Sequence, residues 1–592
     1  MKKSLILILL ITILSSELIY SQIDDTITIM HAKAYQWSYE NNFMKADSDS
    51  YDLDTVNFFY FSPYKDYKYM LTNDLVGGVS YPAYLPELTS SYEISEIKLP
   101  YLRFVGFFDI ENIPLLVSDT AIMQARFMQG ISREEYFQAH FTMPISDIAH
   151  FNFFYRTFAA NSTYTNSSVR QNQFYSTFFG NTKNKKYNYY LGILQQNRTT
   201  KENGGILDMS SFTDSAKTDR ILLDVLLKNA RAFHRTSDYF YSHSYNVSKS
   251  LSIFHHISYS QYSFKYEDPT PTLDFYSPNV VMLNDSVFDT LHVWQLDNKL
   301  GLNFNNNIWE VNLSYNYSIG KYKMDSIRTK PIFSTINAII SYRNLVKLDL
   351  QYYLGNYKNN KIVLSGALPF ISYEIGYNNY SQSYIYSHFL GKYYKYIDTL
   401  PNTDLLWARI GNKNKFGSIS IFGGYIDNKL YFDEDGITNF TKSIIFAGLE
   451  LDLEFKIGKH LAIQSYNLLQ YPFDNKTLSV PLWLTRDAFY YHTSIFKGNA
   501  YLKTGIEFLY FTKYYAPKWN PNIQYFETSR DKLGNFIYPS LYLQLKIKKA
   551  VIFAQLENFT DGLFKSRQYM PIVGYPMRDM SFRWGLQWNF YN

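Results

Sequence analysis

The strongest constraint in this sequence is a strict alternation of apolar and polar residues over runs of about nine positions. The clearest runs are Val311 to Ile319, Val346 to Leu354, Leu449 to Ile457, Leu541 to Ile547 and Phe582 to Phe590. Successive side chains of a β-strand point to opposite faces, so each run predicts a strand with one apolar and one polar face.

These runs are long enough to cross a lipid bilayer. A tilted transmembrane strand needs about 9–11 residues, whereas strands of soluble proteins typically have about 5–6. Aromatic residues make up 19% of the chain, with 57 Tyr and 46 Phe, and transmembrane barrels place such residues at their interfaces and toward lipid. A soluble β-sandwich also has one apolar face. Strand length, aromatic content and charges in series on the polar faces favour an all-β, antiparallel transmembrane β-barrel.

The first 21 residues have the organisation of a secretory signal peptide. Lys2 and Lys3 precede the apolar run Leu5 to Leu14, and a polar stretch ends at Ser21 and Gln22. The run is too short for a membrane-spanning helix, which needs about 20 residues, so a membrane anchor is the weaker alternative. No later apolar stretch is long enough either, which excludes a helical membrane protein. We therefore expect an exported outer-membrane protein that is cleaved near Ser21.

We divide the chain into a signal peptide at residues 1–21, an N-terminal periplasmic or rim segment at 22–97 and an outer-membrane β-barrel at 98–592. At roughly 30 residues for each strand with its connection, the barrel region predicts about 16 strands, within a range of about 14–18. The polar segments Asn161 to Asn172 and Glu267 to Asp289 are expected to be extracellular loops. Lipid does not tolerate an open sheet edge, so we expect one closed barrel with both ends on the periplasmic side.

The polar faces of two runs provide the candidates for a pore lining. A Lys or Arg on the lipid face at mid-bilayer costs roughly 2–4 kcal/mol, so charges in series on one face should point into a wet lumen. The candidate pore-lining residues are Lys347, Asp349, Gln351, Glu450, Asp452, Glu454 and Lys456.

The last alternating run is expected to close the barrel and to act as its assembly signal. Its apolar face carries Phe582, Trp584, Leu586, Trp588 and Phe590, opposite Arg583, Gly585, Gln587 and Asn589. Closure alone removes sheet edges, so this strand should pair with both its predecessor and the first strand. The partners expected from these features are outer-membrane lipid and the barrel-assembly machinery.

No motif for catalysis, metal binding or a cofactor occurs in the sequence. The histidines His255 and His256 are adjacent, so on a strand they point to opposite faces and cannot both bind one metal. A Gly-x-Ser-x-Gly elbow, a Walker loop and a His-Glu-x-x-His motif are all missing from the sequence. The chain has no cysteine, which excludes disulfides and a lipoprotein anchor. Lys and Arg number 57 against 52 Asp and Glu, without basic runs, so nucleic acid is not an expected partner.

Several short motifs resemble the putative porin family of Bacteroidetes-type outer membranes. They are Tyr510 to Pro517, Trp519 to Pro521 with Phe526, Leu556 to Phe559, Tyr575 to Met577 and Phe582 to Asn592, with Glu202 to Ile206 and Asp52 to Tyr60 in the N-terminal half. They occur in the order of the family, whereas residues 265 to 440 carry no matching motif. The resemblance implies a barrel with a channel-like role and brings no catalytic residues.

We therefore expect a porin-like channel for the passive diffusion of small polar solutes or ions, and not an enzyme. The alternatives are a structural or secretion-linked barrel with a filled lumen, and a barrel hydrolase whose triad is assembled from distant strands. An energised receptor would need a globular plug before the barrel. Residues 22–97 are a short segment for such a plug, which disfavours this alternative. The sequence does not decide whether the chain forms a homo-oligomer.

Overall fold

The computed structural model describes residues 33–38, 43–46, 67–72, 79–90 and 95–118, and most of residues 120–591. The gaps in the last range are residues 132, 147, 162–163, 214–219, 277–285, 307, 344, 356–358, 398–399, 435–437 and 562–568. The expected signal peptide at residues 1–21 and the motif Asp52 to Tyr60 lie outside the described residues.

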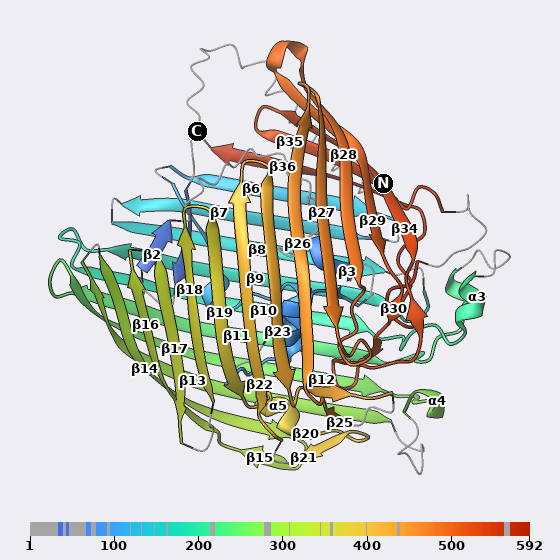
Figure 1. The fold of residues 1–592 in the computed structure, drawn as a ribbon, viewed down its shortest axis with the longest axis horizontal. Coiled ribbons are helices and arrows are strands. Elements are labelled where there is room, and N and C mark those ends of the chain that lie inside the picture. Colours follow the sequence, from blue (N-terminus) through green and yellow to red (C-terminus); the bar gives the residue numbers. More distant parts are fainter. Residues whose placement is uncertain are drawn as a thin grey trace, which may run out of the picture.

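The main body of the molecule is one closed antiparallel barrel of 22 strands (Figure 1). Its strands are β6 (Ile122–Gly130), β7 (Glu135–Ser146), β8 (Ala149–Asn161), β9 (Ser168–Asn181), β10 (Tyr187–Lys201), β11 (Arg231–Asn246), β12 (Leu251–Asp268), β13 (Val287–Asn305), β14 (Trp309–Met324), β16 (Ile332–Tyr342), β17 (Val346–Leu354), β18 (Asn360–Leu368), β19 (Ile371–Tyr380), β22 (Thr403–Asn414), β23 (Gly417–Asp427), β26 (Ile444–Ile457), β27 (Leu461–Pro472), β28 (Trp483–Ile495), β29 (Ala500–Phe511), β34 (Phe536–Ile547), β35 (Ala550–Glu557) and β36 (Ser581–Tyr591). The short β15 (Ile327–Thr329) shares one place in the wall with β16, because both pair with β14.

All five alternating runs lie within wall strands, which confirms the antiparallel barrel, but the expected number of about 16 strands is wrong. The assumed spacing of one strand per 30 residues was too wide, because every second connection is a tight turn. For example, only Lys548 and Lys549 separate β34 from β35. The barrel also begins later than residue 98, since its first strand starts at Ile122.

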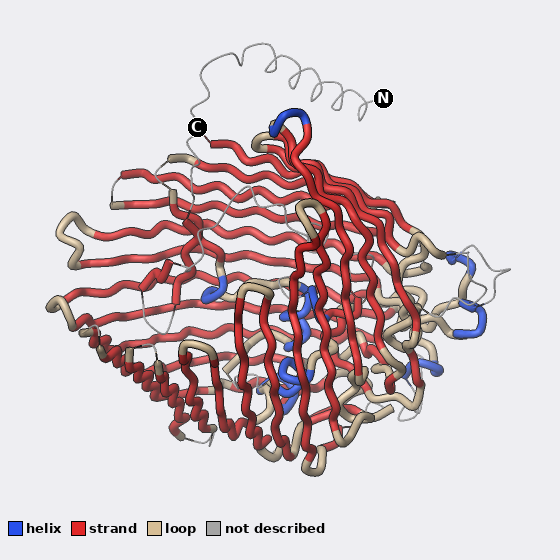
Figure 2. The backbone as a smooth tube through the Cα atoms, turned by 45° about the horizontal axis from the view of Figure 1, so that its top comes forward, coloured by secondary structure: helices blue, strands red, loops and turns tan. Residues whose placement is uncertain are grey.

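The two rims of the barrel differ in their connections (Figure 2). Long connections lie on one rim, at residues 202–230, 269–286, 381–402, 428–443, 512–535 and 558–580, and we call it the loop rim. The opposite turn rim carries tight turns, together with the start of β6 and the end of β36, which pair at Ile122 and Tyr591. Short turns face the periplasm in barrels of this kind, so we expect the loop rim to be extracellular. Half of the segment Asn161 to Asn172 is strand, because β8 ends at Asn161 and β9 begins at Ser168.

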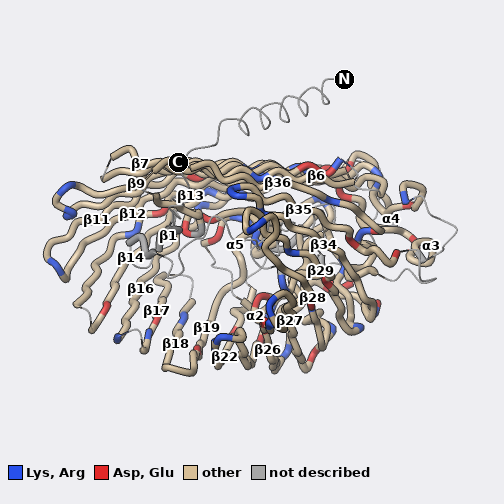
Figure 3. Tube along the Cα trace, turned by 90° about the horizontal axis from the view of Figure 1, so that it is seen from above, with Lys and Arg blue, Asp and Glu red and all other residues tan. Residues whose placement is uncertain are grey.

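Part of the chain before β6 folds inside the barrel, and we call its described residues 67–118 the inserted segment. It contains β3 (Met70–Thr72), β4 (Tyr81–Pro82), α2 (Leu85–Thr89), the 3-10 helices η1 (Tyr67–Tyr69), η2 (Pro100–Val105) and η3 (Ile110–Asn112), and β5 (Pro114–Val117). β5 pairs with β1 (Lys33–Ser38), which pairs with β2 (Phe43–Ala46). In Figure 3, β1 and α2 lie between the two walls of strands.

The long connections add small elements that pack over the inserted segment. They are α3 (Met209–Thr213), η4 (Arg220–Leu222), α4 (Leu273–Tyr276), α5 (Tyr384–Ser387), β20 (His388–Leu390), β21 (Lys395–Ile397), β24 (Leu430–Phe432), β25 (Thr438–Phe440), β30 (Tyr514–Tyr515), β31 (Lys518–Asn520), β32 (Tyr525–Glu527) and β33 (Lys532–Leu533), while η5 (Phe496–Gly498) lies at the turn rim. The largest buried core lies inside the barrel and joins Tyr81 and Leu102 of the inserted segment to Trp519 and Ile572 of the loops. None of the described helices is long and apolar enough to cross a membrane.

The faces of the wall strands follow the period of two. On β13 the outward side chains Leu296, Leu300, Leu302 and Phe304 are exposed, as expected for a lipid-facing band. Inward positions of the same strand are polar or buried, for example Gln295 and Asn303. The lumen therefore receives many of the hydrogen-bonding side chains of the wall, and several of these hold the inserted segment.

Candidate functional site

The candidate functional site is the lumen, where the inserted segment meets two opposite parts of the wall. On the side of β8 to β10, amide side chains bind its backbone. Asn152 accepts a hydrogen bond from the N–H of Leu116 and donates one to its C=O, both at 3.0 Å. Gln196 does the same with Phe108, at 2.7 and 2.9 Å. An amide carries both a donor and an acceptor, so it can satisfy a buried peptide group as a neighbouring strand would.

The carbonyl of Gly106 is held by charged and amide groups from the same part of the wall. Arg156 on β8 and Gln173 on β9 donate to it at 2.7 and 2.8 Å. Arg156 also donates to the side chain of Gln173 at 2.6 Å. Gly106 has a φ of 73° and ends η2, so a glycine fits the reversal of the chain at this point.

On the opposite side, Glu450 on β26 ties the inserted segment to the wall. Tyr84 donates to Glu450 at 3.1 Å, and Arg409 on β22 donates to both, at 2.8 Å to the Tyr84 hydroxyl and 2.5 Å to the carboxylate. Burial first, and then the Glu450 charge, raise the pKa of Tyr84, so this phenol stays protonated and continues to donate. Gln470 on β27 adds a third backbone clamp, binding Leu85 N–H at 3.0 Å and Ala83 C=O at 2.7 Å.

Two further side chains of the wall hold the start of the inserted segment. Asp452 on β26 forms an ion pair with Lys68. Arg486 on β28 forms an ion pair with Glu507 at 2.6 Å and also donates to the carbonyl of Met70 at 3.2 Å. Glu450 and Asp452, which we expected to line the pore, therefore point inward and bind the inserted segment.

The other expected pore-lining residues also lie on inward faces. Lys347, Asp349 and Gln351 alternate with the outward Val346, Leu348, Leu350 and Tyr352 on β17, and Asp349 forms an ion pair with Lys361 at 3.1 Å. Glu454 and Lys456 are exposed near the turn rim, where Glu454 accepts a hydrogen bond from Tyr490 at 2.9 Å. The structure thus separates the candidates: Glu450 and Asp452 contact the inserted segment, whereas Glu454 and Lys456 face water.

A pocket lies at the loop rim, where the inserted segment meets the folded loops, and we call it the mouth pocket. Its lining includes Tyr101, Phe104, Tyr431, Tyr525, Phe526 and Glu527. Glu527 is buried beside Lys518 at 3.6 Å and accepts a hydrogen bond from Asn520 at 2.5 Å. Burial raises the pKa of Glu527 to about 7 despite the opposing charge of Lys518. The pocket therefore combines aromatic faces with a carboxyl group that titrates near neutral pH.

The closing strand β36 pairs with β35 and with β6, and its two faces differ sharply. Phe582, Trp584, Leu586, Trp588 and Phe590 lie on the outward face, where Trp584 packs against Phe127 of β6. Inward, Gln587 accepts from Arg126 at 3.0 Å, and Gln124 donates to Asn589 at 3.1 Å. Polar pairs in the lumen thus join the last strand to the first.

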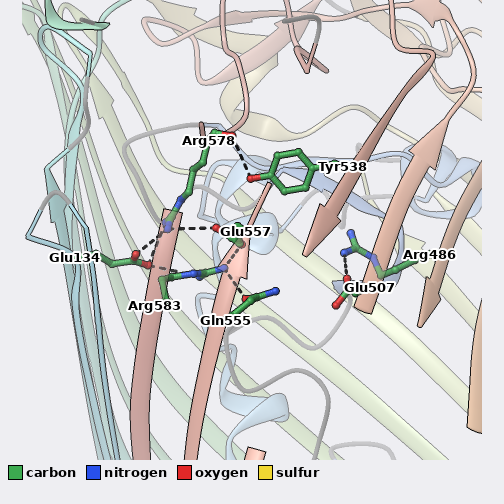
Figure 4. A network of polar contacts seen from close by, with 8 residues as sticks. All are labelled: Glu134, Arg486, Glu507, Tyr538, Gln555, Glu557, Arg578 and Arg583. Atoms are coloured by element: carbon green, nitrogen blue, oxygen red, sulfur yellow. Dashed lines mark hydrogen bonds and ion pairs between the residues drawn. The ribbon is translucent and has the colours of Figure 1, made fainter. Parts of the chain in front are cut away.

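A buried network of two arginines and two glutamates extends this seam toward the loop rim (Figure 4). Arg578 makes a bidentate contact with Glu134, at 2.8 and 3.1 Å, and Arg583 pairs with Glu557 and lies 3.7 Å from Glu134. Burial opposes the charged form of Glu134, but the two arginines lower the pKa of Glu134 on balance. Equal numbers of opposite charges make this network electrically neutral, which reduces the cost of burying it.

His255 and His256 point to opposite faces of β12, as the sequence predicts. His256 points inward and bonds Ser242 at 2.5 Å, whereas His255 is on the outward face with His243. Among the described residues, no group of three or more His, Asp or Glu side chains is arranged to hold a metal ion.

The sequence separated residues 22–97 from the barrel as a periplasmic or rim segment but did not place them in the lumen, because these residues follow no regular period. The wall strands contain a feature that could have predicted a filled lumen. Their polar faces carry the amide residues Asn152, Gln173, Gln196 and Gln470. Buried amides need hydrogen-bond partners, so a row of them indicates that something other than water fills the lumen.

Comparisons with known proteins agree with this architecture. The chain is similar in fold to the siderophore receptor PirA from Acinetobacter baumannii, with 10% identity, a TM-score of 0.57 and coverage of 81% of this chain and 83% of that one. A mutant of the ferric enterobactin receptor from Pseudomonas aeruginosa gives 10% identity, a TM-score of 0.55 and coverage of 81% and 82%. The copper transporter OprC gives 10% identity, a TM-score of 0.57 and coverage of 81% and 83%. No curated protein sequence matches the chain.

At these identities the structural likeness establishes the fold alone. The sequence model described as putative porin matches residues 38–592, which include the barrel and the inserted segment. The chain is therefore an outer-membrane β-barrel and belongs to the putative porin family.

Proposed function

We propose that the protein is a channel for small polar solutes or ions whose lumen is narrowed by the inserted segment. The observation that carries this proposal is the division of the lumen along β26. Glu450 and Asp452 hold the inserted segment, while Glu454 and Lys456 are exposed toward the turn rim. A wall lined with charges of both signs suits hydrated solutes rather than lipids or apolar molecules.

In this proposal the inserted segment acts as a gate. It is held by separate hydrogen bonds to the backbone, from Asn152, Gln196 and Gln470, rather than by a continuous strand pairing to the wall. Single side-chain hydrogen bonds contribute about 0.5–1.5 kcal/mol each, and no described pairing of the wall has to break, so the segment can move without opening the barrel once its core contacts with the loops separate. Passive diffusion then occurs while the segment is displaced.

Conductance in a planar bilayer tests the gate, and β10 offers a matched pair of variants. Gln196 points inward to Phe108, whereas its neighbour Gln195 points outward and is exposed. We expect Gln196→Ala to open more often than the wild type and Gln195→Ala to behave like the wild type. Equal conductance in all three proteins would contradict the gate, and no conductance in any of them would favour either a permanently filled lumen or a gate that opens only when a ligand is bound.

A substrate-gated receptor is the second candidate, and the mouth pocket favours it. The pocket lies where the inserted segment meets the loops, and the siderophore and copper proteins with a similar fold are receptors or transporters. Under this alternative, a bound ligand rather than a thermal fluctuation displaces the segment. Both Gln196→Ala and the wild type would then stay closed in a bilayer without ligand.

We further propose that residues 1–21 are removed on export and that the chain has no catalytic role. Mass spectrometry of protein purified from outer membranes tests the first point, with a mature chain expected to begin at Gln22. Lipase and protease assays on the same preparation test the second, and activity above that of a mock preparation would overturn it.

A further inference from the structure

Among the polar groups on the outward face of the barrel, two clusters lie between apolar residues on opposite sides of the ring. The first, which we call the acidic cluster, consists of Ser465 and Asn467 on β27 with Thr485 and Asp487 on β28. Ser465 and Thr485 donate hydrogen bonds to the two oxygens of Asp487, at 2.5 and 2.8 Å. Asn467 donates to Ser465 at 2.8 Å and accepts from the indole of Trp483 at 2.9 Å.

The acidic cluster lies on the outer face, within the apolar band. Arg486 points inward to Glu507, so the adjacent Asp487 points outward. Along β27, the outward residues Leu461 and Ile463 lie on the turn-rim side of the cluster and Leu469 and Tyr471 on the loop-rim side. Among the described residues, Asp487 has hydroxyl partners and no ion pair. An ionisable group in this setting is a strong indication of a binding partner within the membrane.

The second cluster consists of His243 on β11, His255 on β12 and Asn298 on β13, and we call it the histidine cluster. The two rings face each other across the strand pair, with His243 Nε2 and His255 Nδ1 3.1 Å apart. His255 Nε2 lies 3.2 Å from the side-chain oxygen of Asn298. Apolar outward residues again lie on both sides, with Ile253 toward the turn rim and Ile257 toward the loop rim.

The two clusters lie on opposite sides of the barrel, at equal residue counts from the starts of β27 and β12. Ser465 is the fifth residue of β27 and His255 is the fifth residue of β12, and both strands rise from the turn rim. In the closed strand order, β28 is about half-way round the ring from β12. A carboxylate on one side and imidazoles on the other are complementary, because an imidazole can donate to or carry a proton for a carboxylate.

We propose that copies of this chain associate side by side in the membrane, with the acidic cluster of one copy against the histidine cluster of the next. The contact gives Asp487 a nitrogen hydrogen-bond donor within the bilayer core, where no water is present to donate. It joins different surfaces of the two copies, so it is heterologous. Because the two surfaces lie on opposite sides of the barrel, repeated contacts extend into a row rather than closing into a small ring.

Cysteine cross-linking tests this arrangement cleanly, because the chain has no cysteine of its own. Leu469 and Leu296 are outward and exposed, each beside one of the clusters but outside it. We expect Leu469→Cys and Leu296→Cys proteins to form a disulfide dimer only when co-expressed. A chain carrying both substitutions should give a ladder of higher oligomers. As a matched control, Phe582→Cys on the exposed face of β36 should not cross-link to Leu296→Cys.

A charge-neutral variant tests the role of the acidic cluster itself. Asp487→Asn keeps one acceptor oxygen but loses the charge and the second acceptor, so we expect at least about a tenfold loss of the mixed cross-link. The heat-modifiable shift on a gel confirms that this variant is a folded barrel. Cross-links between like cysteines, cross-links to a different protein, no mixed cross-link, or an unchanged yield in Asp487→Asn would each overturn the proposal.

Discussion

The side chain of Asn152 binds both the N–H and the C=O of Leu116, each at 3.0 Å. Gln196 repeats this contact with Phe108, and Gln470 repeats it with the peptide groups of Ala83 and Leu85. The lumen wall thus uses amide side chains in place of a neighbouring strand. Peptide groups of Ala83, Leu85, Phe108 and Leu116 are thereby hydrogen-bonded, while the inserted segment stays separate from the strand pairing of the wall.

The first prediction concerns this double contact. In Asn152→Asp the carboxylate still accepts from Leu116 N–H but repels the Leu116 carbonyl, which keeps its hydrogen bond from Thr142 at 2.7 Å, so the loss of one hydrogen bond should cost about 0.5–1.5 kcal/mol. We expect faster hydrogen exchange at residues 114–117 with an intact barrel. Asn197→Asp, on the outward face of β10, serves as the control. Unchanged exchange in Asn152→Asp would show that the clamp does not hold the segment.

The second prediction concerns the buried ion network at the seam. Arg583→Met removes one of two arginines and leaves Glu557 without its main partner, which should destabilise the barrel by about 3–5 kcal/mol. The double variant Arg583→Met with Glu557→Leu should recover much of this loss, because it restores neutrality. Denaturant-induced unfolding in detergent measures both. Arg231→Met is the control, since Arg231 pairs with Glu267 while half exposed and contributes about 0–1 kcal/mol.

The third prediction concerns assembly. Deleting residues 582–592 removes the strand that pairs with both β35 and β6, so we expect no heat-modifiable protein in the membrane. The deletion alone does not distinguish the loss of barrel closure from the loss of recognition by the barrel-assembly machinery. We therefore expect Leu586→Arg, on the lipid face, to reduce insertion through a cost of roughly 2–4 kcal/mol, since Leu586 is outward and half-buried. Normal membrane insertion of the truncated chain would refute the assignment.

The fourth prediction separates charges that face water from charges that hold the gate. Glu454 is exposed near the turn rim, so Glu454→Lys should shift the reversal potential toward anions without changing how often the channel opens. Glu450 binds Tyr84 and Arg409, so Glu450→Lys should release the inserted segment and raise the open probability. Bilayer recordings of both variants in a salt gradient provide the measurement, and identical effects would contradict the division of the lumen.

The fifth prediction concerns pH. The pKa of Glu527 is raised from its ordinary 4.5 to about 7 by burial, so folding favours its protonated form. Its contribution to stability is therefore complete below about pH 4.5 and is lost as the pH rises through about 7. Relative to Glu527→Gln, which stays neutral, the wild type should lose melting temperature between pH 5 and pH 8. A constant difference between the two proteins across this range would be evidence against a titrating Glu527.

The alternating sequence by itself determined the class of fold and the orientation of side chains. Val346 to Leu354 forms β17 with the residue bounds that the alternation indicates, and Phe582 to Phe590 lies within the closing strand. This works because the face of a strand on which a residue lies depends only on its own position in a period of two. The same reasoning placed Glu450, Asp452, Glu454 and Lys456 on one inward face.

Only the tertiary structure decided how many strands close the ring and what occupies its centre. Strand number depends on pairings between neighbours, and weakly alternating strands such as β18 and β23 are recognised only through them. The inserted segment depends on contacts between distant positions, such as Lys68 with Asp452, which are 384 residues apart. A contact of this kind leaves no period in the local sequence, because its geometry is set by the closure of the whole barrel around the segment. For the same physical reason Glu450 and Glu454, four positions apart on one face, differ in their contacts: one meets the inserted segment and the other meets water.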